Sequence, residues 1–375
     1  MILEKFNYPI YFDYAATTPT DSTVLEEMLP YFTKVYGNAS SSTHLHGDFA
    51  RNAIRKAQKQ IAELISADPN EIYFTSGSTE SINLAMKGIF DAYKKNGNHI
   101  ITTKTEHKAV LDTCGYLEEI GAEVTYLDVD SKGLIDLDEL KGSIKKSTIL
   151  VTVMYANNET GVLQDILSIN EICRKHNVTF FSDTTQAIGK IDLNLNNVPI
   201  DILCFSGHKI YGPKGIGGLY IRKGIKPSMQ IHGGGHQNKM RSGTLNVPGI
   251  VGLGKAAELA QINQKNESER LKQLRDNLEE ILTLDNKIKI NGSKENRLPN
   301  ISNIQLLGQE AEEFILRNKK KISVAMGSAC NSEVIEPSHV LKAMGLSDNE
   351  AGCSIRISLG HSVNKEHIEE LINCI

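Results

Sequence analysis

The sequence predicts an α/β fold: a mostly parallel seven-stranded sheet between two layers of helices, together with a smaller α+β domain. Apolar runs rich in β-branched residues alternate with amphipathic, helix-length segments as far as about residue 250. This alternation is typical of a parallel sheet that is covered on both faces. A chain of 375 residues that is 40% hydrophobic is long enough to build two cores.

The first part of the chain contains the elements of the large sheet. Strands are expected at residues 71–75, 99–103, 123–128, 148–155, 178–183, 201–205 and 217–222. Helices are expected between them at residues 48–65, 79–95, 108–120 and 165–176. Each helix-length segment is long enough to cross over from one parallel strand to the next.

The second part of the chain has a different texture. A long, increasingly polar helical pattern covers residues 250–283 and is followed by short elements. Strands are expected at 287–291, 300–306 and 322–326, and helices at 308–318, 337–344 and 364–373. We therefore expect a large domain at residues 15–260 and a small domain made of residues 1–14 and 261–375.

Charge and composition exclude several classes of protein. A net charge of −4 gives no electrostatic reason to expect direct nucleic-acid or membrane binding. No segment approaches the roughly 18–20 consecutive apolar residues of a membrane span, and the N-terminus does not resemble a signal peptide. The 6 cysteines form no Cys-x-x-Cys pair, so a disulfide framework is not expected. These features predict a cytoplasmic protein.

Polar side chains follow five of the predicted strands. In an open parallel sheet, ligands bind beyond the carboxyl ends of the strands, so these side chains should meet at one edge. They are residues 76–80, 106–108, 157–159, Asp183 with Gln186, and 206–209.

Taken singly, each of these groups also has a simpler interpretation. Residues 76–79 suit a phosphate at a helix N-terminus, but they also fit an ordinary N-cap. A lysine such as Lys209 is usually a solvated surface charge. His232 and His236 have the spacing of a metal pair, but the three glycines between them do not favour a helix, and no metal site is expected.

The combination of Lys209 and Asp183 predicts pyridoxal 5′-phosphate as the cofactor. A lysine in a loop beyond a buried strand can lose its proton through desolvation and form a Schiff base. A carboxylate at the end of the preceding strand can keep a pyridine nitrogen protonated, so that the ring accepts electrons. His107, at the same edge, is placed to stack on such a ring and to move protons.

The motifs identify a family that the chain resembles. They are FDYAATTP (12–19), TSGSTES (75–81), TKTEHKAVLDTC (103–114), NNETGVLQD (157–165), SGHKIYGPKGIGGLY (206–220), HGGGH (232–236), MRSGTLNVPGIVG (240–252), GSACNS (327–332) and SIRISLG (354–360). Together they resemble the pyridoxal-phosphate-dependent cysteine desulfurases of the class V aminotransferase superfamily. The resemblance covers most of the chain and implies the fold-type I architecture of these enzymes.

The resemblance implies a role for each matching residue. Lys209 would bind the cofactor covalently, Asp183 would pair with its ring nitrogen, His107 would stack on the ring, and Gln186 would contact its phenolic oxygen. The phosphate would be held by Ser78, Thr79, Ser206 and His208, and by Thr244 of the neighbouring subunit in a homodimer. Arg356, Asn38 and Asn158 would hold the substrate, with Asn158 also touching the cofactor.

Cys330 distinguishes a desulfurase from an ordinary aminotransferase. From local sequence alone it could be a small residue in a turn, but the resemblance implies that its thiolate attacks the sulfur of L-cysteine. The products would be L-alanine and a persulfide on Cys330. The loop resembles the longer kind of the iron–sulfur-cluster and nitrogen-fixation branch, and its sulfur would go to an acceptor protein.

The acceptor and the reaction class have alternatives. Cluster-assembly relatives carry a C-terminal tail beyond the last helix, and its absence here favours a dedicated acceptor such as a tRNA-thiolating enzyme over an iron–sulfur scaffold. A selenocysteine lyase or another aminotransferase of the same fold is the nearest rival. A non-catalytic sulfur-relay subunit is a second rival, although such a subunit should have lost some of the five residues Lys209, Asp183, His107, Arg356 and Cys330.

Overall fold

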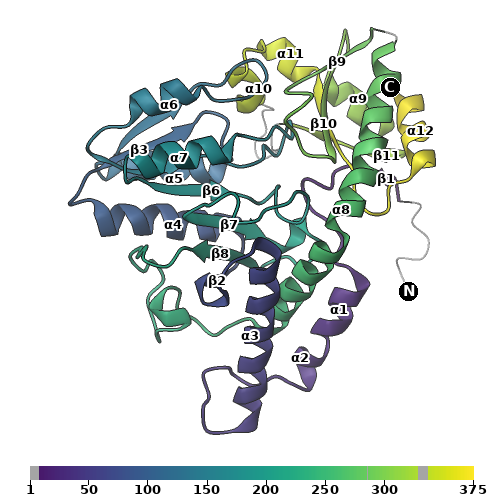
Figure 1. Cartoon of the computed structure of the whole chain (residues 1–375). Coiled ribbons are helices and arrows are strands. Elements are labelled where there is room, and N and C mark those ends of the chain that lie inside the picture. Colours follow the sequence, from purple (N-terminus) through teal and green to yellow (C-terminus); the bar gives the residue numbers. More distant parts are fainter. Residues whose placement is uncertain (1–7, 285, 328–336) are drawn as a thin grey trace.

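The centre of the molecule is a seven-stranded sheet. A computed structural model of the chain describes residues 8–284, 286–327 and 337–375 (Figure 1). The strands of this sheet are β2 (Ile72–Thr75), β3 (His99–Thr103), β4 (Glu123–Leu127), β5 (Thr148–Thr152), β6 (Thr179–Asp183), β7 (Ile202–Ser206) and β8 (Gly217–Ile221). Their order is β2-β8-β7-β6-β5-β3-β4, and only β8 runs antiparallel to its neighbours. The predicted mostly parallel, seven-stranded sheet is confirmed.

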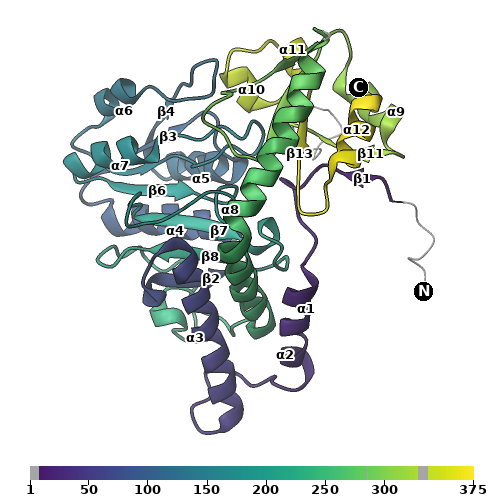
Figure 2. The ribbon, with the colours of Figure 1, turned by 45° about the vertical axis from the view of Figure 1, so that its right-hand side comes forward.

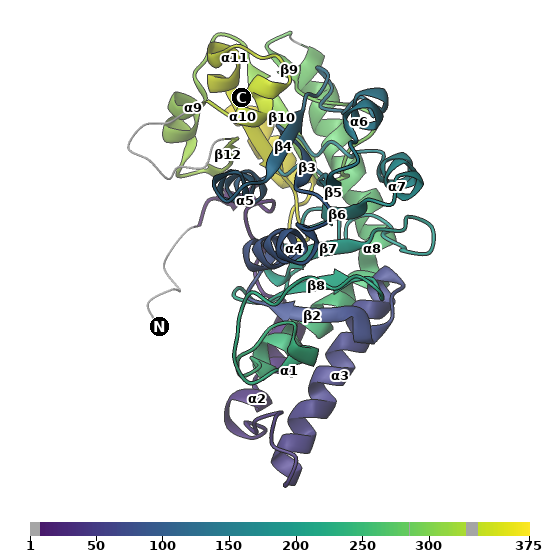
Figure 3. The same cartoon turned by 90° about the vertical axis from the view of Figure 1, so that its left-hand side faces the viewer.

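Helices cover both faces of this sheet. They are α3 (Leu45–Ile65), α4 (Ser78–Tyr93), α5 (Lys108–Glu119), α6 (Leu137–Ser143), α7 (Ile166–Lys175) and α8 (Val247–Leu284). The short helices α1 (Ser22–Met28) and α2 (Pro30–Thr33) pack against α8. Figure 3 shows α4 and α5 on one side of the strands and α7 and α8 on the other. The alternation of side chains along β7 explains the two layers, because Ile202 packs in the α4–α5 core while Leu203 packs in the opposite one.

A second, smaller sheet has its own core. Its strands β9 (Ile288–Ile290), β10 (Ile301–Leu306), β12 (Ala325–Met326) and β13 (Ser354–Ser358) pair antiparallel in the order β12-β13-β10-β9. The remaining elements nearby are the parallel pair β1 (Ile10–Tyr11) and β11 (Ile322–Ser323), and the helices α9 (Ala311–Asn318), α10 (His339–Ala343), α11 (Asp348–Gly352) and α12 (Lys365–Cys374). This arrangement agrees with the expected α+β unit.

Helix α8 connects the two cores. Its first half contributes Ile250 and Leu253 to the core of the large sheet, and its second half contributes Leu274 and Leu278 to the core of the small sheet. Figure 2 shows this helix running along the length of the molecule. The expected domain boundary at residue 260 falls inside this continuous helix and stays a prediction.

The N-terminal segment crosses from the small sheet to the large one. Phe12 accepts a backbone hydrogen bond from Ser358 of β13 at 2.8 Å, and the amide of Thr18 donates to the carbonyl of His208, beyond β7, at 2.9 Å. The chain between these two anchors therefore passes close to the carboxyl end of β7.

None of the helices in the described ranges combines the length and the apolar character that a membrane span needs. Within the same ranges, no three His, Cys, Asp or Glu side chains gather as a metal site.

The close contact between α3 and α8 predicts a measurable cost for one added methyl group. A Cβ at Gly254 of α8 would lie 2.6 Å from the Cα of Ala57 in α3, so we expect Gly254→Ala to destabilise the protein by about 1–3 kcal/mol through overpacking. Gly142 in α6 has nothing within 4 Å of its added Cβ, and Gly142→Ala should be neutral or stabilising by up to about 1 kcal/mol. Thermal denaturation of both variants compares them, and equal melting temperatures would contradict the close packing.

Candidate active site

One cavity collects most of the predicted site residues. It has a volume of about 680 Å³ and lies beyond the carboxyl ends of β2, β6 and β7. The predicted residues that line it are Ser78, Thr79, His107, Asn158, Asp183, Gln186, Ser206, His208, Lys209 and Arg356. Strand ends of a parallel sheet meet at a single edge, and this explains why residues so far apart in the sequence converge.

Lys209 forms part of the wall of this cavity. It ends the short 3₁₀ helix η2 (Gly207–Lys209), directly after β7. Its Nζ donates hydrogen bonds to the carbonyls of Ala15 and Ala16 at 2.7 and 2.6 Å. Burial, helped by the nearby guanidinium of Arg356, lowers the pKa of the Lys209 amine to about 8. The neutral, nucleophilic form of this amine is therefore a minor but appreciable fraction near physiological pH, far more than for an ordinary lysine.

Asp183 is the last residue of β6 and is buried. Its Oδ1 accepts a hydrogen bond from the amide of Thr185 at 2.9 Å and lies 3.5 Å from the thiol of Cys204. The side chain is fixed at the cavity by these contacts, as a carboxylate that pairs with a ring nitrogen must be. Gln186 follows in the same turn and is also buried.

The N-terminus of α4 offers donors for a phosphate. Gly77 is the N-cap residue and has no side chain to occupy the free N–H groups of the first turn. A Cβ at Gly217 would lie 2.6 Å from the Cα of Gly77, so the backbone there is closely packed. The hydroxyls of Ser78 and Thr185 lie 2.5 Å apart beside this helix end. These groups can surround the oxygens of a phosphate.

His208 and His107 lie at different walls of the cavity. His208 Nδ1 lies 3.1 Å from the hydroxyl of Thr17. Burial, together with the positive charges of Lys209 and Lys214, lowers the pKa of His208 to about 4, so its ring is neutral at physiological pH. His107 caps α5, and its Nδ1 accepts a hydrogen bond from the amide of Ala109 at 3.0 Å. This contact leaves Nε2 of His107 for a ligand.

Arg356 reaches the cavity from the small sheet. It lies on β13, and its two terminal nitrogens donate to Asp13 Oδ1 at 2.6 Å and to the carbonyl of Asn158 at 2.9 Å. Its buried Nε has no hydrogen-bond partner. A guanidinium held in one orientation suits a carboxylate, which it can bind with two parallel hydrogen bonds.

The residues of the cavity fit pyridoxal 5′-phosphate. The cavity supplies a lysine amine of lowered pKa, a fixed buried carboxylate, a histidine at the rim, and free donors at a helix N-terminus, each at a separate position. These are the groups that hold the aldehyde carbon, ring nitrogen, ring face and phosphate of this cofactor.

Three predicted residues do not line the cavity. Asn38 is exposed between α2 and α3, where its Oδ1 accepts a hydrogen bond from the amide of Ser40. Thr244 is exposed in the segment that precedes α8. Cys330 lies outside the described residues. The roles of all three stay predictions.

Three ionisable groups near the cavity, two buried carboxyls and the amine of a partly exposed lysine, received no individual role from the sequence. The carboxyl of Glu106 is fully buried beside Asp183, its Oε2 has no hydrogen-bond partner, and burial raises its pKa well above the usual value. Burial likewise raises the pKa of Glu159 to about 7. The third group, the amine of Lys190, hydrogen-bonds to Gln186. Glu106 and Glu159 lie inside the quoted motifs, but their burial and altered pKa values arise only in the folded chain.

Comparison with known proteins identifies the family. The family model described as Aminotransferase class-V matches residues 10–371. The chain therefore belongs to the class-V aminotransferases, which are pyridoxal-phosphate-dependent enzymes.

Its relatives are more specific. The chain is 48% identical over 371 residues to a protein named cysteine desulfurase IscS from Pectobacterium carotovorum, covering 98% of this chain and 92% of the relative. It is 50% identical over 372 residues to the protein of that name from Buchnera aphidicola, with the same coverage. These identities place the chain in the cysteine desulfurase branch of the family.

Solved structures agree with this assignment. A structure named NifS-like protein superposes with a TM-score of 0.91 at 37% identity and covers 97% of both chains. A structure described as SspA in complex with cysteine superposes with a TM-score of 0.83 at 39% identity, covering 93% of this chain and 98% of that one.

The lowered pKa of Lys209 predicts how cofactor loading depends on pH. Only the neutral amine attacks an aldehyde, and the neutral form predominates above the pKa. The rate at which apoenzyme acquires the visible absorbance of bound cofactor should rise with pH and level off above a midpoint near 8. A stopped-flow series at fixed cofactor concentration measures this midpoint. A rate that continues to rise up to the ordinary lysine pKa of about 10.4 would contradict the lowered value.

Proposed function

We propose that the chain converts L-cysteine to L-alanine and passes the sulfur, as a persulfide on Cys330, to an acceptor protein. The observation that carries this proposal is the convergence of Lys209, Asp183 and Arg356 on one cavity. The first two residues suit the cofactor, and the third suits the carboxylate of an amino-acid substrate. The identity with proteins named cysteine desulfurase supports cysteine as that amino acid.

Arg356 orients the substrate in this proposal. Its guanidinium receives the substrate carboxylate in exchange for part of its contact with Asp13, and Asn158 stands beside it because its carbonyl already accepts from Arg356. With its carboxylate held at β13, the substrate directs its amino group toward Lys209. Asn38 is the third expected contact.

Lys209 moves the proton in this proposal. When bound, the cofactor supplies an electron sink for the charge left on the substrate Cα. Asp183 keeps the ring nitrogen protonated, and the Lys209 amine, with its pKa lowered to about 8, is a base suited to remove the Cα proton near neutral pH. His107 stands at the rim as a second proton-carrying group.

The sulfur step requires a thiolate. Cys330 attacks the substrate sulfur, a sulfur–sulfur bond forms, and the bond between the substrate Cβ and its sulfur breaks. The electron pair of that bond stays on Cβ, which takes up a proton and becomes the methyl group of alanine. This half of the reaction needs no external oxidant or reductant.

The residues next to the Cys330 segment support this step. The Ser338 hydroxyl donates to Oε2 of Glu159 at 2.5 Å, and a Cβ on Gly327 would overlap the same oxygen. Residues 327 and 338 are therefore held together beside Asn158.

A homodimer is the second part of the proposal. Large apolar side chains are between 48% and 68% exposed around α1, α2 and the start of α3, namely Leu25, Leu29, Phe32, Tyr36, Leu45 and Phe49. These helices project from the large sheet (Figure 1). Exposed apolar side chains gathered in this way are typical of a protein interface. Thr244 lies three residues after Arg241, which pairs with Glu80 at the cavity, and its exposed side chain is available to a second copy.

We further propose a cytoplasmic location and a protein acceptor that is either an iron–sulfur scaffold or a tRNA-thiolating enzyme. The five cysteines within the described residues are free and buried, as expected in a reducing compartment.

Replacement of the catalytic thiol tests the proposed reaction. Cys330→Ser should bind the cofactor with its visible band but release no alanine from L-cysteine, because a hydroxyl cannot accept the sulfur. Cys353→Ser, which changes a buried cysteine of the small sheet's neighbourhood, is the matched control and should keep its turnover. Alanine and sulfide are measured after addition of L-cysteine and a thiol reductant. Turnover by Cys330→Ser would contradict the sulfur step, and a comparable rate with an oxo acid as nitrogen acceptor would favour an aminotransferase.

Subunit mixing tests the shared site. Lys209→Ala and Thr244→Val should each be impaired alone, because one lacks the lysine and the other lacks a phosphate contact for its partner. A mixed dimer contains one site with both native residues. Activity after mixing and re-association should therefore exceed the mean of the two separate variants, and activity equal to that mean would contradict a site built from both subunits.

A further inference from the structure

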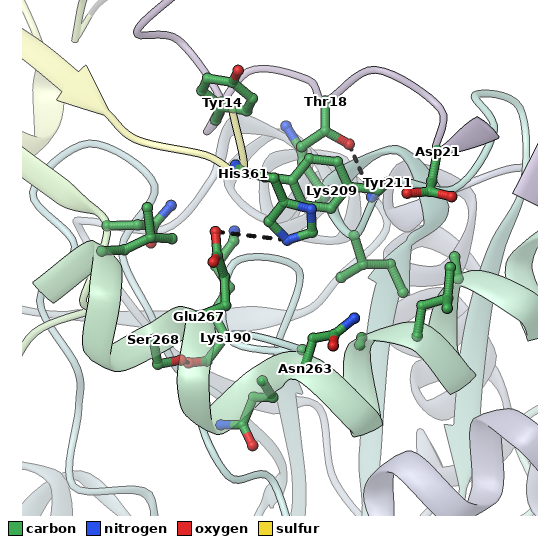
Figure 4. A pocket seen from close by; sticks show the side chains of 18 of the residues that line it. Tyr14, Thr18, Asp21, Lys190, Lys209, Tyr211, Asn263, Glu267, Ser268 and His361 are labelled. Carbon is green, nitrogen blue, oxygen red and sulfur yellow. Dashed lines mark hydrogen bonds and ion pairs between the residues drawn. The ribbon is translucent and has the colours of Figure 1, made fainter. Parts of the chain in front are cut away.

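A second cavity lies behind the cofactor cavity. Its volume is about 290 Å³, and it is enclosed by the N-terminal segment, η2, α8 and the chain after β13. Figure 4 shows Lys190 and Lys209 among its lining residues, together with Tyr211, Glu267 and His361. Lys209 lines both cavities. Of these two cavities, Gln186 lines only the cofactor cavity and Lys190 lines only the second, rear cavity. Gln186 and Lys209 thus form the wall that separates them.

Lys190 reaches this wall from the rear. Its Nζ donates a hydrogen bond to Oε1 of Gln186 at 2.7 Å, and Nε2 of Gln186 donates to the carbonyl of Ala15 at 2.8 Å. The same carbonyl accepts from Lys209. Lys190, Gln186, Ala15 and Lys209 therefore form one continuous chain of hydrogen bonds across the wall.

This contact determines which way the Gln186 amide faces. The ammonium form of Lys190 can only donate and the carbonyl of Ala15 can only accept, so both contacts place the amide oxygen toward Lys190 and the amide nitrogen toward Ala15. The amide nitrogen then points away from Lys190 and has two N–H groups. One is committed to Ala15, and the other remains for the cofactor cavity.

Lys190 is held in place by a backbone contact, although its positive charge has an unfavourable environment. Its carbonyl accepts a hydrogen bond from the Ser268 hydroxyl of α8 at 2.5 Å. Within the described residues it forms no ion pair with a carboxylate, and burial, together with the positive charges of Lys209 and Arg356, lowers its pKa to about 7. A lysine charge that is largely removed from water without an ionic partner is unfavourable, so a contribution to stability does not explain the position of Lys190.

We propose that Lys190 is a positioning residue that fixes the Gln186 amide from outside the cofactor cavity, so that an N–H faces the phenolic oxygen of the bound cofactor. This inference rests on the role proposed for Gln186. A hydrogen-bond donor at the phenolic oxygen stabilises the negative charge on that oxygen. The oxygen then binds less tightly the proton that it would share with the Lys209 nitrogen. Lys190 thereby lowers the pH at which bound cofactor loses that proton.

Lys190→Met removes the donor while keeping most of the length of the unbranched side chain. In the holoenzyme, the pH midpoint at which the visible absorbance band of the cofactor titrates should rise by roughly half to one unit, the equivalent of one hydrogen bond. The same substitution in a Gln186→Ala background should have little further effect, because the amide that Lys190 orients is gone. Absorbance titrations of the four proteins form a double-mutant cycle.

The stability of the apoenzyme separates positioning from a structural role. The pKa of Lys190 in the folded chain lies below its ordinary value, so the unfavourable burial of its charge is fully present below about pH 7 and disappears as pH rises toward the ordinary lysine pKa. Apo Lys190→Met should therefore melt no lower than the parent at pH 6.5. A lysine needed for folding would instead lower the melting temperature when replaced.

Two results would overturn the proposal. One is an unchanged midpoint in Lys190→Met, and the other is an equal shift in the presence and absence of Gln186, which would indicate a charge effect alone. Failure of the proposed function would look different, because the parent protein would then show no visible band or release no alanine from L-cysteine.

Discussion

The backbone of residues 13–18 is the constraint on which the rest of the site depends. This segment is anchored to β13 at one end and to His208 at the other, and between these anchors the carbonyls of Ala15 and Ala16 accept the Lys209 amine. Both sheets therefore meet at the amine that we propose carries the chemistry. Neither sheet alone could place Lys209 opposite Arg356, since the two residues belong to different cores.

Positive charge dominates the interior around this segment. Lys209, Lys190 and Arg356 surround the wall between the two cavities. The positive charges of Lys209 and Arg356 help to lower the pKa of Lys190, and the charge of Arg356 helps to lower that of Lys209. Asp13 and Asp183 offset only part of this charge. Such an interior is unfavourable when empty of anions, and it favours a ligand with a phosphate and a substrate with a carboxylate. The same concentration of positive charge therefore favours anionic ligands and makes the interior unfavourable without them.

Much of this arrangement could be predicted from the sequence. All seven strands of the large sheet were predicted close to their observed positions, because parallel strands buried on both faces appear as continuous apolar runs. The strand ends then indicated the site, since the carboxyl edge of such a sheet is fixed by topology. The family resemblance supplied the individual roles, and ten of the residues it indicated line one cavity.

Other features depended on tertiary contacts. Strand β13 was not predicted as a strand, because its alternating Ser354, Arg356 and Ser358 suggest a polar face, yet all five of its residues are buried. The short helices α6 and α11 were also missed, since 7 and 5 residues give too little periodicity. Lys190 and Gln186 are only four residues apart in the sequence. Their hydrogen bond matters to the site because Ala15 and Lys209 continue it, and these two residues approach from elsewhere in the chain.

The measurement that tests this account most directly is the identity of the lysine that carries the cofactor. Lys190 and Lys209 both have a lowered pKa, and that of Lys190 is the lower, so reactivity alone does not decide between them. Geometry does decide between these two lysines, because Lys209 lines the cofactor cavity and Lys190 does not. Borohydride reduction of the holoenzyme, followed by peptide mass spectrometry, should find the cofactor on Lys209 alone. Its presence on Lys190 would contradict the positions of the two cavities on which the account rests.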